Sequence, residues 1–225
     1  MGEITVTMNG RQMSGSEGMT ILEIAQENGI DIPTLCYRPE LTPIGACRIC
    51  VVEVEGSRTL VGSCHTPITQ GMVIHTHSPK VLETRKTIVE LLLASHSDSC
   101  LVCDKANICE LRKIAADLEV GLLRFRVRKR YYPVEDVSPY IVRDLTKCIL
   151  CRRCVRACSE IKKEQVFSVA YRGFDSKVVV DFDQPIDTEV CRDCDVCIPL
   201  CPTGALGKPS EVRGEKKGKP LIING

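Results

Sequence analysis

The chain has 225 residues, a net charge of +1 with neutral histidines, and only 4% aromatic residues. This charge balance gives no indication of nucleic-acid binding, and no apolar run approaches the length of a membrane span. The chain carries fifteen cysteines, and its first residues lack the basic and apolar pattern of a secretory signal. We therefore expect a reducing compartment, the cytoplasm, and metal-binding cysteines rather than disulfides.

The first segment predicts a small unit of strands and one helix. Apolar and polar residues alternate at its start, as in a half-buried strand, and Asn9-Gly10 favours a tight hairpin. Thr20 and Glu23 have the spacing of a capping box at the start of a helix. The strands expected here cover residues 3–8, 11–14, 51–54, 60–61 and 72–76.

The same segment carries four cysteines with the spacing C-x10-C-x2-C-x13-C, namely Cys36, Cys47, Cys50 and Cys64. Plant-type 2Fe–2S ferredoxins use C-x4-C-x2-C and a distant fourth cysteine. The longer first gap resembles the 2Fe–2S domain that begins the large iron–sulfur subunit of NADH dehydrogenase. The order of hairpin, helix, ligand loop and hairpin resembles the β-grasp fold of that family. A four-cysteine zinc site is the alternative.

The next segment predicts two helices and a strand. Ser78 and Pro79 favour a helix start, with serine as the cap and proline in the first turn, and the helix should end near residue 95. A second helix is expected over residues 106–119. Alternation of apolar residues with arginine predicts a strand at 123–128. Its basic face is either solvated, a docking surface, or a positive cover near a negatively charged cluster.

A histidine and three cysteines with the spacing H-x3-C-x2-C-x5-C follow the first of these helices. They are His96, Cys100, Cys103 and Cys109. The pattern resembles the 4Fe–4S site with one histidine and three cysteine ligands in the NADH dehydrogenase subunit and in iron-only hydrogenases. The alternatives are a zinc site with the same donors and a solvated histidine at a helix end.

Two runs of C-x2-C-x2-C-x3-C dominate the last third of the chain, with a hairpin expected between them at residues 166–182. The runs resemble bacterial ferredoxins with two 4Fe–4S clusters, in which the fourth cysteine of each run ligates the other cluster. Zinc knuckles are the alternative, but they would not explain the third and fourth cysteine of each run. The resemblance implies one set of Cys148, Cys151, Cys154 and Cys201, and another of Cys191, Cys194, Cys197 and Cys158.

These four sets use all fifteen cysteines and one histidine, which predicts one 2Fe–2S and three 4Fe–4S clusters. The expected fold class is α+β. The expected units are a β-grasp 2Fe–2S ferredoxin-like domain at 1–78, a small helical domain with the histidine-ligated 4Fe–4S cluster and a connecting strand at 79–140, a two-cluster bacterial-ferredoxin-like domain at 141–207, and a polar tail at 208–225.

In this order the motifs resemble the small diaphorase subunit of NAD(P)-linked nickel–iron hydrogenases. They also resemble the N-terminal region of the large iron–sulfur subunit of NADH dehydrogenase. Iron-only hydrogenases and NAD-dependent formate dehydrogenases share the plan. The NADH dehydrogenase subunit typically lacks the set of Cys158, Cys191, Cys194 and Cys197, so its presence favours the hydrogenase and formate dehydrogenase versions.

The resemblance implies an electron-transfer subunit of a multi-subunit NAD(P)-linked oxidoreductase. Its partners would be a flavin- and NAD(P)-binding subunit and a catalytic hydrogenase or dehydrogenase subunit. The sequence shows no dinucleotide-binding fingerprint and no catalytic acid, base or nucleophile constellation, so we expect no substrate site of its own. The alternatives are a free-standing multi-cluster ferredoxin and a redox or iron sensor, for which no effector domain is visible.

Overall fold

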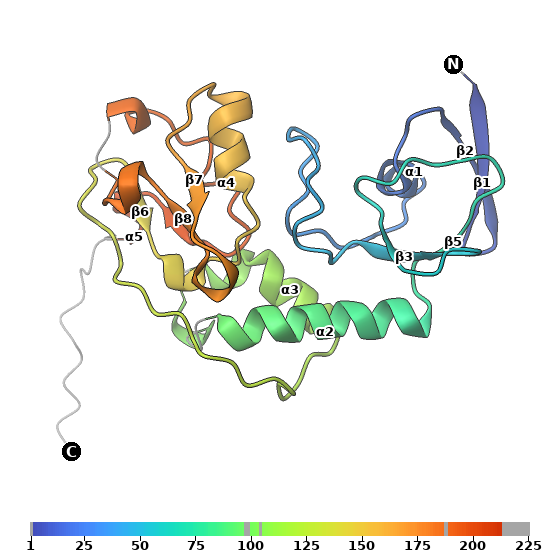
Figure 1. Ribbon diagram of the computed structural model, residues 1–225, viewed down its shortest axis with the longest axis horizontal. Helices are drawn as coiled ribbons and strands as arrows, with labels where there is room; N and C mark the ends of the chain where they lie inside the picture. Colours follow the sequence, from blue (N-terminus) through green and yellow to red (C-terminus); the bar gives the residue numbers. More distant parts are fainter. Residues whose placement is uncertain (1, 97–99, 104, 187–188, 213–225) are drawn as a thin grey trace.

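The computed structural model describes residues 2–96, 100–103, 105–186 and 189–212 (Figure 1). We call the part of the chain from β1 (Glu3–Met8) to β5 (Val73–His75) the N-terminal unit, the part from α2 (Pro79–Ser95) to α3 (Glu110–Asp117) the middle unit, and the part from β6 (Val142–Arg143) to α5 (Pro209–Val212) the C-terminal unit. The long helix α2 (Pro79–Ser95) runs below the other two units (Figure 1). Within the described part of the chain, no helix combines the length and apolar character needed to cross a membrane.

The N-terminal unit is a five-stranded sheet in the order β2-β1-β5-β3-β4. The strands β1 and β5 pair in parallel and the other neighbours are antiparallel. All five predicted strands are present; two of them have the predicted ends, and the ends of the other three differ by one or two residues. Their bounds are β1 Glu3–Met8, β2 Arg11–Ser16, β3 Val51–Val54, β4 Val61–Gly62 and β5 Val73–His75.

The helix α1 (Ile21–Glu27) packs on this sheet and starts at the predicted capping box. The Glu23 amide donates to the Thr20 hydroxyl at 3.3 Å, and the Glu23 carboxylate accepts from the Thr20 amide at 2.7 Å. These bonds satisfy two backbone amides that the first helical turn would leave open. The helix face joins the sheet in one apolar core, which includes Val6, Met8, Ile21, Leu22, Ile24, Ala25 and Ile74.

The middle unit confirms the first predicted helix and corrects the second. The Val81 amide donates to the Ser78 hydroxyl, so α2 has the expected cap. The second helix, α3, covers only Glu110–Asp117, because Ala106–Ile108 forms a 3-10 turn and Cys109 has extended backbone torsions. The Glu110 amide donates outside the helix, to the Pro202 carbonyl at 2.9 Å. The start of α3 is therefore anchored on the C-terminal unit.

The strand predicted at residues 123–128 is wrong, because this segment has no regular secondary structure. It runs along α2 as an extended strap (Figure 1). Arg124 donates to the Glu90 carboxylate at 2.7 Å and to the Glu83 carboxylate at 2.8 Å. A strand needs a neighbouring strand for its backbone hydrogen bonds, whereas this segment is held by its side chains. Arg124 at least is therefore not simply solvated, whereas Arg126 and Arg128 are exposed.

The C-terminal unit has two small antiparallel sheets, β6 (Val142–Arg143) with β9 (Leu206–Gly207), and β7 (Ser168–Ala170) with β8 (Lys177–Val179). The second sheet is the predicted hairpin. The helix α4 (Arg153–Arg156) continues into a π-helical turn at Ala157–Ile161. The last helix, α5 (Pro209–Val212), lies where the polar tail was expected, and residues 213–225 fall outside the described residues.

Candidate iron–sulfur centres

All fifteen cysteines lie in the described residues and none forms a disulfide. They occupy loops, short helical turns and helix ends. Their surroundings differ from one predicted set to the next.

The first set belongs to the N-terminal unit, in the loop between α1 and β3 and after β4. The Cys36 and Cys47 thiols are hydrogen-bonded to each other, and so are those of Cys50 and Cys64. This bonding lowers the pKa of Cys36 and Cys50, and it raises the pKa of their partners. The structure therefore brings these four cysteines together, because each thiol shifts the pKa of its neighbours.

The second set lies in the middle unit, around the 3-10 turns at Cys100–Val102 and Ala106–Ile108. The Cys103 amide donates to the Cys100 carbonyl at 3.4 Å. Burial raises the pKa of Cys109 most, and the nearby Cys103 and Cys100 raise it further. These three cysteines are therefore neighbours.

His96 is the C-cap residue directly after α2, and it is buried, with 7% of its surface exposed. The alternative of a solvated histidine is therefore wrong. Its ring Nε2 lies 3.1 Å from the Lys147 carbonyl oxygen in the C-terminal unit. A carbonyl only accepts hydrogen bonds, so Nε2 carries a proton and donates. In the neutral ring this leaves the lone pair on Nδ1.

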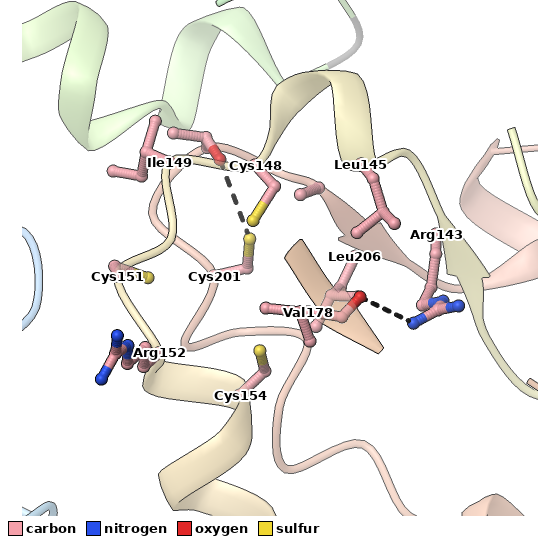
Figure 2. Close-up of a pocket in the computed structure, with 12 residues that line it drawn as sticks. Arg143, Leu145, Cys148, Ile149, Cys151, Arg152, Cys154, Val178, Cys201 and Leu206 are labelled. Carbon is pink, nitrogen blue, oxygen red and sulfur yellow. Dashed lines mark hydrogen bonds between the residues drawn. The ribbon is translucent and has the colours of Figure 1, made fainter. Parts of the chain in front are cut away.

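The third set lines a single cavity in the C-terminal unit. Figure 2 shows the sulfurs of Cys148, Cys151, Cys154 and Cys201 directed into the same space. Apolar side chains such as Leu145 and Leu206 complete the wall. Burial raises the pKa of Cys148 to about 11 and that of Cys151 to about 12.

The fourth set lines a second cavity, which Phe167 and Val196 help to close. Its cysteines are Cys158, Cys191, Cys194 and Cys197. Cys158 lies in the π-helical turn that extends α4, and such turns are frequent at functional sites. The last cysteine of each run therefore lies with the first three of the other run.

Three family models match successive parts of the chain. A 2Fe-2S iron-sulfur cluster binding domain matches residues 2–79, and the NADH-ubiquinone oxidoreductase-G iron-sulfur binding region matches residues 85–122. The ferredoxin-like domain of NADH-quinone oxidoreductase subunit 3 matches residues 138–207. A chain of the NAD+-reducing [NiFe]-hydrogenase, solved in its H2-reduced state, superposes with a TM-score of 0.84 at 30% identity, covering 91% of this chain and 86% of that one. The chain belongs to the iron–sulfur subunit family of NADH-quinone oxidoreductases and NAD+-reducing hydrogenases.

Curated members of the family show the same likeness over part of their length. The NADP-reducing hydrogenase subunit HndD of Solidesulfovibrio fructosivorans is 43% identical over 218 residues. The mitochondrial 78 kDa subunit of NADH-ubiquinone oxidoreductase from Candida albicans (strain SC5314 / ATCC MYA-2876) is 34% identical over 216 residues. These alignments cover 92% and 95% of this chain but 36% and 30% of the two relatives. The chain therefore spans about a third of the length of these curated relatives.

The donor groups suit the iron–sulfur clusters that the family models describe. Thiols buried in the cavity of Cys148 and Cys151 favour the neutral form, whereas metal coordination deprotonates a thiol and supplies the compensating positive charge. Three buried arginine Nε atoms, those of Arg85, Arg153 and Arg156, lack a hydrogen-bond partner among the described residues. Sulfur atoms of a bound cluster would be suitable acceptors for such groups.

Sequence reasoning missed these three buried arginines. Arg85 lies on α2 and donates to the Val51 carbonyl, next to Cys50, at 2.8 Å. Arg153 and Arg156 stand within the first ferredoxin-like run, three residues apart and thus on one face of α4. That spacing inside a cysteine run was the available signal, but an arginine in a loop or short helix is usually solvated.

Proposed function

We propose that the chain relays single electrons within a multi-subunit NAD(P)-linked oxidoreductase. It would do so through one 2Fe–2S cluster in the N-terminal unit, one 4Fe–4S cluster in the middle unit and two in the C-terminal unit, with domain boundaries at residues 78, 140 and 207. Bound clusters of these types accept and release one electron at a time. The proposed ligands are the sixteen residues of the four sets, including His96 for the middle unit.

The observation that carries this proposal is the grouping of cysteines in the C-terminal unit. Each of two separate cavities is lined by four cysteines, three from one run and one from the other. Zinc sites built from adjacent C-x2-C pairs would not require this exchange between the runs. An exchange of the fourth ligand is how bacterial ferredoxins hold two 4Fe–4S clusters.

The partners we propose are a flavin- and NAD(P)-binding subunit at one end of the relay and a catalytic subunit at the other. The names of two matched proteins, an NADP-reducing hydrogenase subunit and an NAD+-reducing [NiFe]-hydrogenase, favour a nickel–iron hydrogenase as the catalytic partner. An equivalent role in a formate dehydrogenase or an NADH dehydrogenase-like complex is the alternative. The chain would have no substrate site of its own and would work in the cytoplasm.

The protein's own contribution is to hold the ligands and to set each potential through burial and hydrogen bonds. The Leu150 amide donates to the Cys148 sulfur at 3.4 Å. The Thr203 hydroxyl lies 4.0 Å from the Cys201 sulfur and donates to the Lys147 carbonyl at 2.7 Å. The Leu150 amide therefore orients the Cys148 sulfur, whereas the Thr203 hydroxyl uses its proton to hold the backbone at Lys147, beside Cys148.

Metal analysis tests the cluster content directly. We expect about fourteen irons per chain from one 2Fe–2S and three 4Fe–4S clusters, with a similar amount of acid-labile sulfide. The chain should be prepared without oxygen. Stoichiometric zinc with correspondingly less iron would contradict at least one of the four assignments.

Single cysteine variants test the exchange between the runs. We expect Cys158→Ser to disturb the centre of Cys191, Cys194 and Cys197, and to leave the centre of Cys148, Cys151 and Cys154 with its normal paramagnetic resonance signal. Cys201→Ser should have the reverse effect. The two variants are matched controls for each other. If each one instead disturbed the centre of its own run, the grouping would be wrong.

A further inference from the structure

The buried guanidinium of Arg153 contacts all three units. Arg153 lies between Cys151 and Cys154 at the start of α4, with 1% of its surface exposed. Its two terminal nitrogens donate to the two carboxylate oxygens of Glu110 at 2.6 and 2.8 Å. The same nitrogens donate to the Leu200 carbonyl at 3.2 Å and to the Tyr37 carbonyl at 3.1 Å.

Each of these partners adjoins a proposed cluster ligand. The carbonyl acceptors lie in the N-terminal and C-terminal units, and the carboxylate lies at the start of α3 in the middle unit. One planar side chain therefore fixes the chain beside three ligands that belong to three centres. The partner and ligand pairs are Tyr37 with Cys36, Glu110 with Cys109, and Leu200 with Cys201.

Arg156, one turn further along α4, strengthens the same junction. It donates to the Thr42 carbonyl at 2.5 Å and to the Cys36 carbonyl. The Thr42 amide in turn donates to the Glu160 carboxylate at 2.7 Å. Leu41 from the same loop is buried in the apolar core of the C-terminal unit. The ligand loop that begins at Cys36 is thus packed onto α4.

We propose that Arg153 is a positioning residue that holds the ligand loops of three centres at fixed separations and supplies buried positive charge to the centre of Cys148, Cys151, Cys154 and Cys201. This inference rests on the proposed electron relay. Electron transfer between centres slows steeply with distance, so a relay needs its ligand loops fixed relative to one another. Arginine suits this role because its rigid fork of donors can bind a carboxylate with two bonds and still reach carbonyl groups.

The opposite charges of Arg153 and Glu110 allow an experiment to distinguish this role from simple packing. A buried cation near a cluster stabilises the reduced, more negative form and therefore raises the potential, while a carboxylate does the opposite. Removing the arginine charge and removing the glutamate charge should therefore shift the potential in opposite directions. A residue that only fills space would give no such pair of signs.

The experiment uses the full chain loaded with iron and sulfide, and titrates each centre by paramagnetic resonance. We expect Arg153→Gln to lower the midpoint potential of the centre of Cys148, Cys151, Cys154 and Cys201, and Glu110→Gln to raise it. Arg153→Lys keeps the charge but loses the fork. It should nearly keep the potential while amide exchange in residues 36–42 becomes faster. The control Lys113→Gln removes a positive charge from the exposed pair with Asp117 and should change neither readout.

Unchanged potentials in both Arg153→Gln and Glu110→Gln, at full iron content, would overturn the inference. Shifts of the two variants in the same direction would also overturn it. If Arg153→Gln does not load iron, two measurements still test the inference. They are the direction of the potential shift in Glu110→Gln and the rate of amide exchange in Arg153→Lys. A wild-type chain without cluster signals would instead overturn the proposed function, so the two failures are distinguishable.

Discussion

Removal of iron and sulfide is expected to unfold the C-terminal unit while the sheet of the N-terminal unit keeps its structure. The C-terminal unit has strands of only two or three residues, and its core contains Cys158 and Cys197 in place of larger apolar side chains. Four further cysteines of the two runs pack against this core. A core that cysteine thiols line, with so little regular secondary structure around it, cannot offset the entropy of an ordered chain without a metal.

The magnitudes support a complete loss of structure there. A structural metal site contributes on the order of 10 kcal/mol to folding, whereas the net stability of a domain is about 5–15 kcal/mol. The N-terminal unit differs because Val6, Ile21, Leu22 and Ile74 form an apolar core between α1 and a five-stranded sheet. Its loop from Cys36 to Cys50 should loosen, but β1, β2 and α1 should remain.

Amide hydrogen exchange before and after chelation under oxidising conditions measures this difference. We expect protection to disappear over residues 148–158 and to persist over residues 3–8. The two segments act as internal controls for each other within one chain. Native-like protection around Cys148 to Cys158 after complete cluster loss would contradict the prediction.

Local signals predicted the parts of the fold in which neighbours in sequence make the decisive contacts. The capping box of Thr20 and Glu23 fixed the start of α1, and Ser78-Pro79 fixed the start of α2. The spacing of the cysteines predicted the four sets, and the resemblance to bacterial ferredoxins implied the exchange between the two runs. Each set includes cysteines only three residues apart, so short loops can gather them.

The predictions failed where contacts between distant residues decide the structure. The alternation at residues 123–128 has the period of a strand, but Arg124 is held by Glu83 and Glu90, 41 and 34 residues earlier. The roles of Arg153 and Arg156 depend on partners more than 40 residues away in the sequence. No local pattern reports such contacts, because the tertiary environment overrides intrinsic propensity.

In His96→Ala the middle unit is expected to lose its cluster, which would lower the iron content by up to about four atoms per chain. The three thiolates of Cys100, Cys103 and Cys109 cannot fill the four iron corners of a 4Fe–4S cluster, and the other cysteines group elsewhere. Since Nε2 of His96 donates to the Lys147 carbonyl, we infer that coordination would use Nδ1. A hydrogen bond at the second nitrogen fixes the ring and makes it a better ligand.

His96→Cys should keep the cluster but lower its potential. A thiolate in place of a neutral imidazole adds one negative charge to the site, which disfavours the reduced form, whereas histidine ligands raise the potential of Rieske centres. The variant also loses the hydrogen bond to Lys147. Since Lys147 precedes Cys148, any effect on the neighbouring centre of the C-terminal unit should be smaller than the effect on the middle unit.

Paramagnetic resonance during a redox titration resolves the centres and checks both variants. His75→Ala is the matched control, because this histidine is partly exposed and pairs with Glu55 on the surface of the N-terminal unit. We expect the control to keep all four signals and potentials, His96→Ala to lose one signal, and His96→Cys to shift one potential downward. A full, unchanged set of signals and potentials in His96→Ala would show that His96 is no ligand. The fourth donor of Cys100, Cys103 and Cys109 would then have to come from another residue, and the burial of His96 would reflect its bond to the Lys147 carbonyl and the packing of the middle unit against the C-terminal unit.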